Sequence, residues 1–231
     1  YEMQVRALME AAKIRVAKGG HPIVEVMIPL TVTREELALA RSWAQKAIDE
    51  VGVDSGKGKK GSLEVLIGTM IETPRAALVA DEIAEVADFF SFGTNDLTQM
   101  TFGFSRDDVE GRIMGPYVES GLLKRNPFEV VDPDGVGALV RMGVKLGRET
   151  KPGLKTGVCG EHGGDPESIG TFYAAGLDYV SCSPFRVPVA RLAAAQAVLT
   201  HGPRAKKASA KKSSPKKAAK KAPAKKAAAK K

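Results

Sequence analysis

The stretch Asp-Phe-Phe-Ser-Phe-Gly-Thr-Asn-Asp-Leu-Thr-Gln-Met-Thr-Phe-Gly-Phe-Ser-Arg (residues 88–106) decides the fold. It opens with a short apolar run over residues 89–92, breaks at Gly93 and continues with the polar cluster of Thr94, Asn95 and Asp96. A continuous apolar run of this length, bounded by glycine, is typical of a buried parallel strand. Polar groups directly after such a strand lie at the carboxyl edge of the sheet, where ligands bind in α/β proteins.

A second strand-like run, residues 63–70, ends in the same way, and Glu72 follows it. Two strand ends therefore present two carboxylates, Glu72 and Asp96. A pair of hard oxygen donors on a rigid edge, completed by water and a ligand, suits Mg²⁺. The alternative is that Glu72 is only the first-turn acid of a helix beginning at Pro74, where the helix dipole favours negative charge. Residues 93–96 would then form a simple Asx turn.

The rest of the chain alternates between strand-like and helical segments. Strands are expected at 23–30, 63–70, 89–92, 155–159 and 179–182, and helices at 1–17, 33–50, 73–87, 132–148, 166–175 and 188–200. Residues 54–61 are expected to form a loop, and residues 101–128 a long connection of little periodicity. Five strand–helix units favour a parallel sheet with helices outside. The pattern alone does not decide between a doubly wound sheet and a barrel.

Charge is distributed unevenly along the chain. The net charge is +8, but 13 of the 35 basic side chains lie in residues 204–231, which contain no acid; the remaining 22 face 27 acidic residues. We therefore expect an acidic domain over residues 1–202 and a disordered Lys/Ala/Pro/Ser-rich tail over residues 203–231, since such a tail has no bulky apolar side chains with which to build a core. Two cysteines provide no disulfide framework, so a reduced, cytoplasmic setting is expected. No apolar run approaches membrane-spanning length, so no membrane partner is expected.

Three motifs carry a family resemblance. They are Met-Ile-Glu-Thr-Pro-Arg (70–75), Ser-Phe-Gly-Thr-Asn-Asp-Leu-Thr-Gln (91–99) and Cys-Gly-Glu-His-Gly-Gly-Asp-Pro (159–166). In this order they resemble the phosphoenolpyruvate (PEP)-utilising enzymes over about residues 1–200. The form of the third motif, with Asp-Tyr-Val-Ser-Cys-Ser-Pro-Phe-Arg-Val-Pro (178–188), resembles the pyruvate, phosphate dikinase branch.

The resemblance implies a fold, a reaction and a set of site residues. The fold would be the last five βα units of a (β/α)₈ TIM-type barrel. The reaction would convert ATP, phosphate and pyruvate to AMP, diphosphate and PEP through a phosphohistidine, and this portion would bind PEP or pyruvate. Glu72 and Asp96 would be the Mg²⁺ ligands, and Cys159 the general acid that protonates the enolate carbon. The substrate-binding residues would be Glu72, Gly93, Thr94, Asn95 and Asp96. Without the resemblance, a cysteine at a strand end is usually a small hydrophobic residue.

The resemblance also implies parts that this sequence does not match. Five strands fall three short of a barrel and leave two apolar sheet edges open, so we expect the chain to be the C-terminal portion of a longer enzyme. Phosphohistidine and ATP-grasp domains are expected upstream or in trans, and the family implies a homodimer. Two substrate-binding arginines of the family have no counterpart here, so we expect no dikinase activity from this chain alone. His162 is interpreted as an orienting residue, because the family's phosphorylated histidine lies on another domain.

A second function remains open from the sequence. The tail resembles the lysine-rich tails of linker histones, and its charge would bind nucleic acid or other polyanions with strong salt dependence. The chain would then be a catalytically inactive barrel fragment that binds polyanions. The intact set of Glu72, Asp96 and Cys159 speaks against this alternative.

Overall fold

The structure, a computed structural model, describes residues 1–52 and 63–202. The expected loop at 54–61 and the tail at 203–231 lie outside the described residues, so the disorder and nucleic-acid binding of the tail remain predictions. Among the described residues, no helix is both long and apolar enough to cross a membrane.

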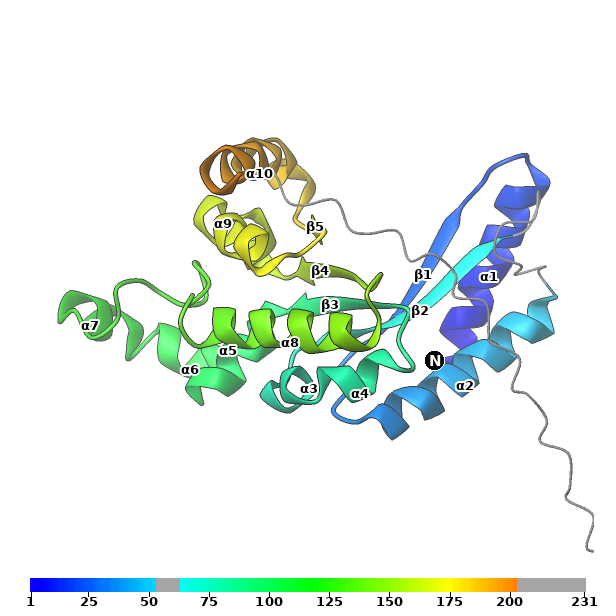
Figure 1. The fold of residues 1–231 in the computed structure, drawn as a ribbon, viewed down its shortest axis with the longest axis horizontal. Coiled ribbons are helices and arrows are strands. Elements are labelled where there is room, and N and C mark those ends of the chain that lie inside the picture. Colours follow the sequence, from blue (N-terminus) through cyan, green and yellow to red (C-terminus); the bar gives the residue numbers. More distant parts are fainter. Residues whose placement is uncertain (53–62, 203–231) are drawn as a thin grey trace, which may run out of the picture.

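A five-stranded parallel sheet forms the centre of the molecule and confirms the α/β prediction (Figure 1). Its strands are β1 (Ile23–Ile28), β2 (Glu64–Ile71), β3 (Phe89–Gly93), β4 (Lys155–Cys159) and β5 (Tyr179–Val180). They pair in the order β1-β2-β3-β4-β5. A doubly wound sheet reverses its strand order at a switch point, whereas successive barrel strands are neighbours. The sequential order is therefore the one expected for a partial barrel and differs from that of a doubly wound sheet. Within the described residues, β1 and β5 each pair on one side only.

Helices connect the strands at nearly all the expected places. The longer ones are α1 (Glu2–Ala17), α2 (Arg34–Val51), α5 (Thr94–Phe102), α8 (Val136–Thr150), α9 (Pro166–Ala175) and α10 (Val187–His201). The shorter ones are α3 (Pro74–Leu78), α4 (Ala80–Ala84), α6 (Arg106–Glu110), α7 (Met114–Glu119) and the 3₁₀ turns η1 (Glu161–Gly164) and η2 (Pro184–Arg186). The hydroxyl of Thr33 accepts from the Glu36 N–H and caps α2 as expected, and Asp165 caps α9 in the same way.

The structure corrects two of the expected helices and adds detail to the long connection. The single helix expected after Thr73 is divided into α3 and α4, because the backbone of Val79 (φ −117°, ψ 31°) lies outside the helical region. The connection at 101–128 contains α6 and α7, packed around Val109, Met114 and Phe128. The helix expected from residue 132 begins at Val136, because the Asp132 carboxylate accepts from the N–H groups of residues 135 and 136 and forms a turn before it.

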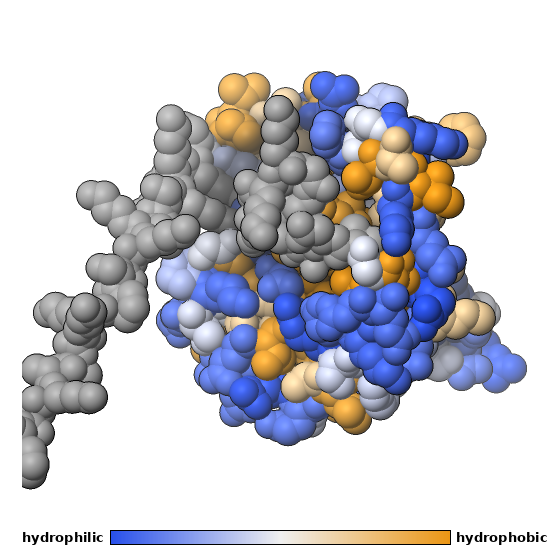
Figure 2. All heavy atoms as spheres, turned by 90° about the vertical axis from the view of Figure 1, so that its right-hand side faces the viewer, coloured by the Kyte–Doolittle hydropathy of each residue, from blue (hydrophilic) through white to orange (hydrophobic). Residues whose placement is uncertain are grey.

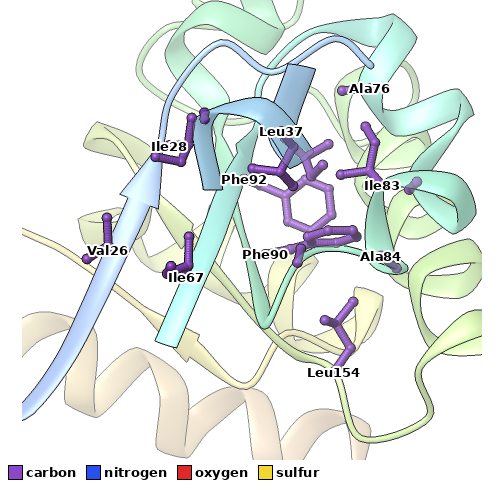
Figure 3. Packing of buried hydrophobic residues seen from close by; sticks show 14 of the residues in the cluster. Val26, Ile28, Leu37, Ile67, Ala76, Ile83, Ala84, Phe90, Phe92 and Leu154 are labelled. Carbon is purple, nitrogen blue, oxygen red and sulfur yellow. The ribbon is translucent and has the colours of Figure 1, made fainter. Parts of the chain in front are cut away.

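The main core lies between the helices and one face of the sheet (Figure 3). Phe90 and Phe92 of β3 are fully buried there, beside side chains from the neighbouring strands and helices: Val26, Ile28, Leu37, Ile67, Ile83, Ala84 and Leu154. Helix α8 approaches this face closely. A Cβ at Gly147 would lie 2.6 Å from the Phe90 ring, so the helix requires glycine at this position.

The opposite face of the sheet is strongly curved. Lys155 of β4 pairs with Glu25 of β1 at 2.6 Å and lies 4.9 Å from the ring centroid of Tyr179. Strands β1 and β4 are three strand spacings apart, about 14 Å in a flat sheet. Their side chains meet only because the sheet bends around this face, as a barrel wall does. Figure 2, viewed from the side of α1 and α2, shows a mostly hydrophilic outer surface with scattered apolar patches.

Candidate active site

Three of the expected site residues lie together at the carboxyl edge of the sheet. Gly93 at the end of β3 pairs with Cys159 at the end of β4. Glu72 follows Ile71, which pairs with Phe92, so Glu72 lies beside Gly93 on the other side. Because side chains alternate along a strand, these three residues share the curved face opposite the main core.

The Glu72 carboxylate is buried, with 2% of the residue exposed. Its Oε1 accepts the main-chain N–H of Leu30 at 2.6 Å. Burial raises the pKa of Glu72, and the Asp96 carboxylate adds to the rise, whereas the hydrogen bond from Leu30 opposes it. Leu30 has a positive φ of 53°, which is unusual for a residue with a side chain. The turn after β1 thus directs one N–H onto this carboxylate.

Asp96 lies in the first turn of α5 rather than in the expected loop. Helix α5, which has nine residues and begins directly after β3, was not predicted from the residue pattern. Asn and Asp suit a helix start as well as a loop, so the residue types did not separate the two. The side chain of Asp96 interacts with that of Glu72, and its Oδ1 accepts from Gln99 Nε2 at 3.1 Å. The helix therefore holds the second carboxylate against the first.

Gly93 allows this arrangement because Glu72 packs directly over it. A Cβ at position 93 would overlap the Glu72 carboxylate and lie 2.8 Å from Met70 Cε. We expect Gly93→Ala to lower the free energy of unfolding by about 1–3 kcal/mol, the usual cost of overpacking. Urea denaturation measures it. The matched control is Gly170→Ala in α9, where a Cβ would meet nothing within 4 Å and alanine should stabilise the helix. Equal stability of the two variants would contradict the close packing.

Thr94 and Asn95 present different groups to the site. Thr94 is fully buried, and its hydroxyl lies 2.8 Å from His162 Nδ1. Only its main chain is left for a ligand. Among the described residues, Asn95 Oδ1 has no hydrogen-bond partner although it is buried. The side chain lines a cleft of about 440 Å³ together with Gly160, Glu161 and Arg186.

The Cys159 thiol is half-buried and lies 3.6 Å from the Phe92 carbonyl oxygen. Burial raises the pKa of the thiol, and the charges of Glu72 and Asp96 act in the same direction. A hydrogen bond with the Ser91 hydroxyl opposes the rise. The environment therefore favours the protonated thiol, the form that a proton donor requires.

The donor set at this edge fits Mg²⁺. Glu72 and Asp96 supply two hard carboxylate oxygens, and neither is engaged in an ion pair among the described residues. Burial raises the pKa of Glu72 and the neighbouring Asp96 carboxylate adds to the rise, and a divalent cation bound between them would favour the ionised form. The part of the chain that the structure describes contains no cluster of three or more His, Cys, Asp or Glu side chains suited to a metal. Substrate oxygens and water would have to complete the coordination.

Several residues near the site were not among the expected site residues. Ser91 hydrogen-bonds to both Cys159 and Tyr179, and the signal for it was its position one strand period before Gly93. Gln99 belongs to the second motif; helix α5 places its amide one turn after Asp96, and its Oε1 accepts the main-chain N–H of Arg106. Arg186, the last residue of η2, also lines the cleft.

Comparison with known proteins places the chain in a family. Residues 1–199 match the model described as "PEP-utilising enzyme, PEP-binding domain". The chain belongs to the PEP-utilising enzymes. Among its relatives, "Pyruvate, phosphate dikinase 1, chloroplastic" of Arabidopsis thaliana is 55% identical over 198 residues, which is 86% of this chain and 20% of the relative. "Pyruvate, phosphate dikinase" of Clostridium symbiosum is 54% identical over 202 residues, 87% of this chain and 22% of that protein.

The chain thus spans about a fifth of the length of the dikinases that it matches. The matched region includes all three motifs and every expected site residue. The family expectation drawn from the sequence is confirmed. The roles of the individual residues remain proposals.

Proposed function

We propose that this chain is the PEP- and pyruvate-binding portion of a pyruvate, phosphate dikinase. It would interconvert pyruvate and the enolate of pyruvate by moving a proton to or from the methyl carbon. The observation that carries the proposal is the meeting of the Glu72–Asp96 carboxylate pair with a protonated thiol, Cys159, around Gly93 at one sheet edge. The complete reaction would convert ATP, phosphate and pyruvate to AMP, diphosphate and PEP. Phosphohistidine and ATP-grasp domains would act upstream or in trans, and the enzyme would be a homodimer in the cytoplasm.

Glu72 and Asp96 would hold Mg²⁺. When bound, the ion would stabilise negative charge on the substrate oxygens as the methyl proton is lost. The main-chain N–H groups at the start of α5, from Thr94 to Asp96, have no acceptor within the helix and can bind the substrate carboxylate or phosphate. The Asn95 amide would orient the same group.

Cys159 would move the proton. In the direction of pyruvate formation, the Sγ–H bond breaks and the proton forms a new C–H bond at the enolate methylene carbon, leaving a thiolate. In the reverse direction the thiolate removes a methyl proton. Such a group must stay at fixed distance over one face of the planar enolate. Strand β4 supplies that rigidity through its pairing with β3.

Exchange of the pyruvate methyl protons for solvent deuterium tests the proposal. We expect the chain with Mg²⁺ and a high concentration of pyruvate in D₂O to lose the methyl signal in proton NMR, and a chelator to stop the loss. We expect no PEP from ATP, phosphate and pyruvate with this chain alone. Pyruvate that keeps its methyl protons at the uncatalysed rate, while Mn²⁺ binding to the chain is demonstrated by water-proton relaxation, would refute the proposed proton transfer.

A further inference from the structure

His162 lies between the two segments that carry candidate site residues, the end of β4 with Cys159 and the first turn of α5 with Asn95 and Asp96. It belongs to η1, the turn that follows Cys159 and Gly160, and it is completely buried. Its Nδ1 lies 2.8 Å from the Thr94 hydroxyl, and its Nε2 lies 2.9 Å from the Pro127 carbonyl oxygen. The ring therefore joins three segments: the loop after β4, the first turn of α5 and the end of the long connection between α5 and α8.

The partners of His162 determine its tautomer. A carbonyl oxygen can only accept, so Nε2 must carry a hydrogen. Burial lowers the pKa of His162, although hydrogen bonding to Pro127 and the charges of Asp165 and Glu161 oppose the decrease, and Arg106 reinforces it. The ring is therefore neutral near pH 7, and its Nδ1 has no hydrogen and must accept. The Thr94 hydroxyl is then the donor in this bond.

This bond fixes the contact between the two catalytic segments. Gly160 packs against the first turn of α5, since a Cβ there would lie 3.1 Å from Thr94 Oγ1 and 3.2 Å from Asn95 Oδ1. Gly160 also has a positive φ of 112°, so the loop turns sharply at this contact. Directly before Gly160 lies Cys159, and directly after Asn95 lies Asp96. We call the contact between residues 159–162 and residues 94–96 the joint. A shift at this joint would move the thiol of Cys159 relative to the carboxylate of Asp96.

We propose that His162 is a positioning residue that accepts the Thr94 hydroxyl hydrogen through Nδ1 and thereby fixes Cys159 relative to Asn95 and Asp96. The predicted effect of His162 on catalysis rests on the proposed function. The hydrogen bond between His162 and Thr94, and the contact that it fixes, do not. Thr94 would accordingly serve a ligand only through its main-chain N–H, because the hydrogen of its hydroxyl is committed to His162.

Two substitutions separate the hydrogen bond of His162 with Thr94 from its hydrogen bond with Pro127. In His162→Asn the side-chain oxygen replaces Nδ1 and can still accept from Thr94, whereas in His162→Gln the longer amide can reach the Pro127 carbonyl but not Thr94. We expect His162→Gln to lower kcat of methyl exchange by about 10- to 100-fold with a small change in KM, because small misplacements have effects of this size. His162→Asn should retain exchange within about threefold of the parent. Equal exchange in the parent and His162→Gln, or equal losses in both variants, would overturn the proposal.

Substitutions at Thr94 provide a conservative rescue. Thr94→Val removes the hydroxyl and should reproduce the exchange defect of His162→Gln, and the double variant should lose no more than either single one. Thr94→Ser keeps the hydroxyl and should recover most of the exchange that Thr94→Val loses. Additive losses in the double variant would show that the two side chains act separately and would overturn the joint.

A readout without catalysis distinguishes this inference from the proposed function. In a Cys182→Ser background, alkylation by iodoacetamide reports the accessibility of Cys159 alone. We expect His162→Gln to raise the alkylation rate about 10-fold and His162→Asn to leave it near the parent value, at equal global stability. If exchange is absent from every form but this difference persists, the proposed function fails and the joint stands. Equal alkylation rates overturn the joint.

Nitrogen NMR tests the tautomer directly. The chain has three histidines, and comparison with His162→Asn assigns the signal of His162. We expect the Nε2-protonated neutral ring, with titration below the usual value of 6.5. A ring protonated at Nδ1 would overturn the assignment of Thr94 as donor.

Discussion

Replacing Cys159 by serine is expected to lower the rate of methyl proton exchange by at least about 100-fold, the usual contribution of a general acid–base group. Serine has nearly the same shape, but its hydroxyl is a far weaker acid, so the proton at the face of the enolate would no longer be transferable. The carboxylates of Glu72 and Asp96 and the main chain of α5 are unaffected by the change. Mn²⁺ affinity, measured by water-proton relaxation, should therefore stay within about threefold of the parent.

Cys182→Ser is the matched control for this prediction. Cys182 is also half-buried and free. It borders the cleft that Asn95 lines, but it packs against the small cluster of Ile169, Ala190 and Ala193, outside the paired ends of β3 and β4. We expect this variant to exchange like the parent. Retained exchange in Cys159→Ser would show that another group moves the proton, whereas a joint loss of exchange and Mn²⁺ affinity would indicate that the thiol supports the site rather than reacts.

Replacing Glu72 by glutamine is expected to abolish metal binding and, at the same time, to stabilise the metal-free protein. Loss of residues that only support metal ligands weakens binding by about 10- to 100-fold, so loss of one of two carboxylates should weaken Mn²⁺ binding at least 100-fold. The amide oxygen can still accept from Leu30, and the amide carries no charge near Asp96. The buried, uncompensated carboxylate of the parent is thereby removed.

The pH dependence of stability follows from the raised pKa of Glu72. The ionised carboxylate is less favourable in the folded chain than in the unfolded chain, where its usual value is 4.5. The parent without metal should therefore be stabilised most by this group below pH 4.5 and lose that contribution as pH rises through the folded pKa. The slope should be smaller in Glu72→Gln. Thermal unfolding with a chelator, at several pH values, measures this difference.

Glu64→Gln is the control at the other end of the same strand. Glu64 begins β2 and is half-buried, but it lies far from the carboxyl edge. It should leave Mn²⁺ affinity unchanged. Two results would contradict the assignment of Glu72 as a metal ligand whose buried charge destabilises the metal-free protein. One is a Glu72→Gln variant that is less stable than the parent without metal, and the other is a variant that still gains stability from Mg²⁺.

Most of the fold could be predicted from the sequence because its signals are local. A continuous apolar run marked β3, a strand-like run marked β2, and the capping residue Thr33 marked the start of α2. The break at Val79 and the start of α5 were missed. In both cases the residue types suit more than one conformation, and the choice is made by the surrounding packing.

The sequence by itself determined the family, the five strands and the proposed ligand-bearing residues, because motif order and strand ends are properties of the chain as written. Only the tertiary structure decided the relations among them. It placed Glu72 over Gly93, joined Asp96 to Glu72 and turned the Thr94 side chain away towards His162. Hydrogen-bond partners and burial depend on segments that are distant in sequence and meet only when the sheet curves. The type of each residue indicated which chemistry it can perform. Its protonation and orientation depend on the side chains that those distant segments place beside it.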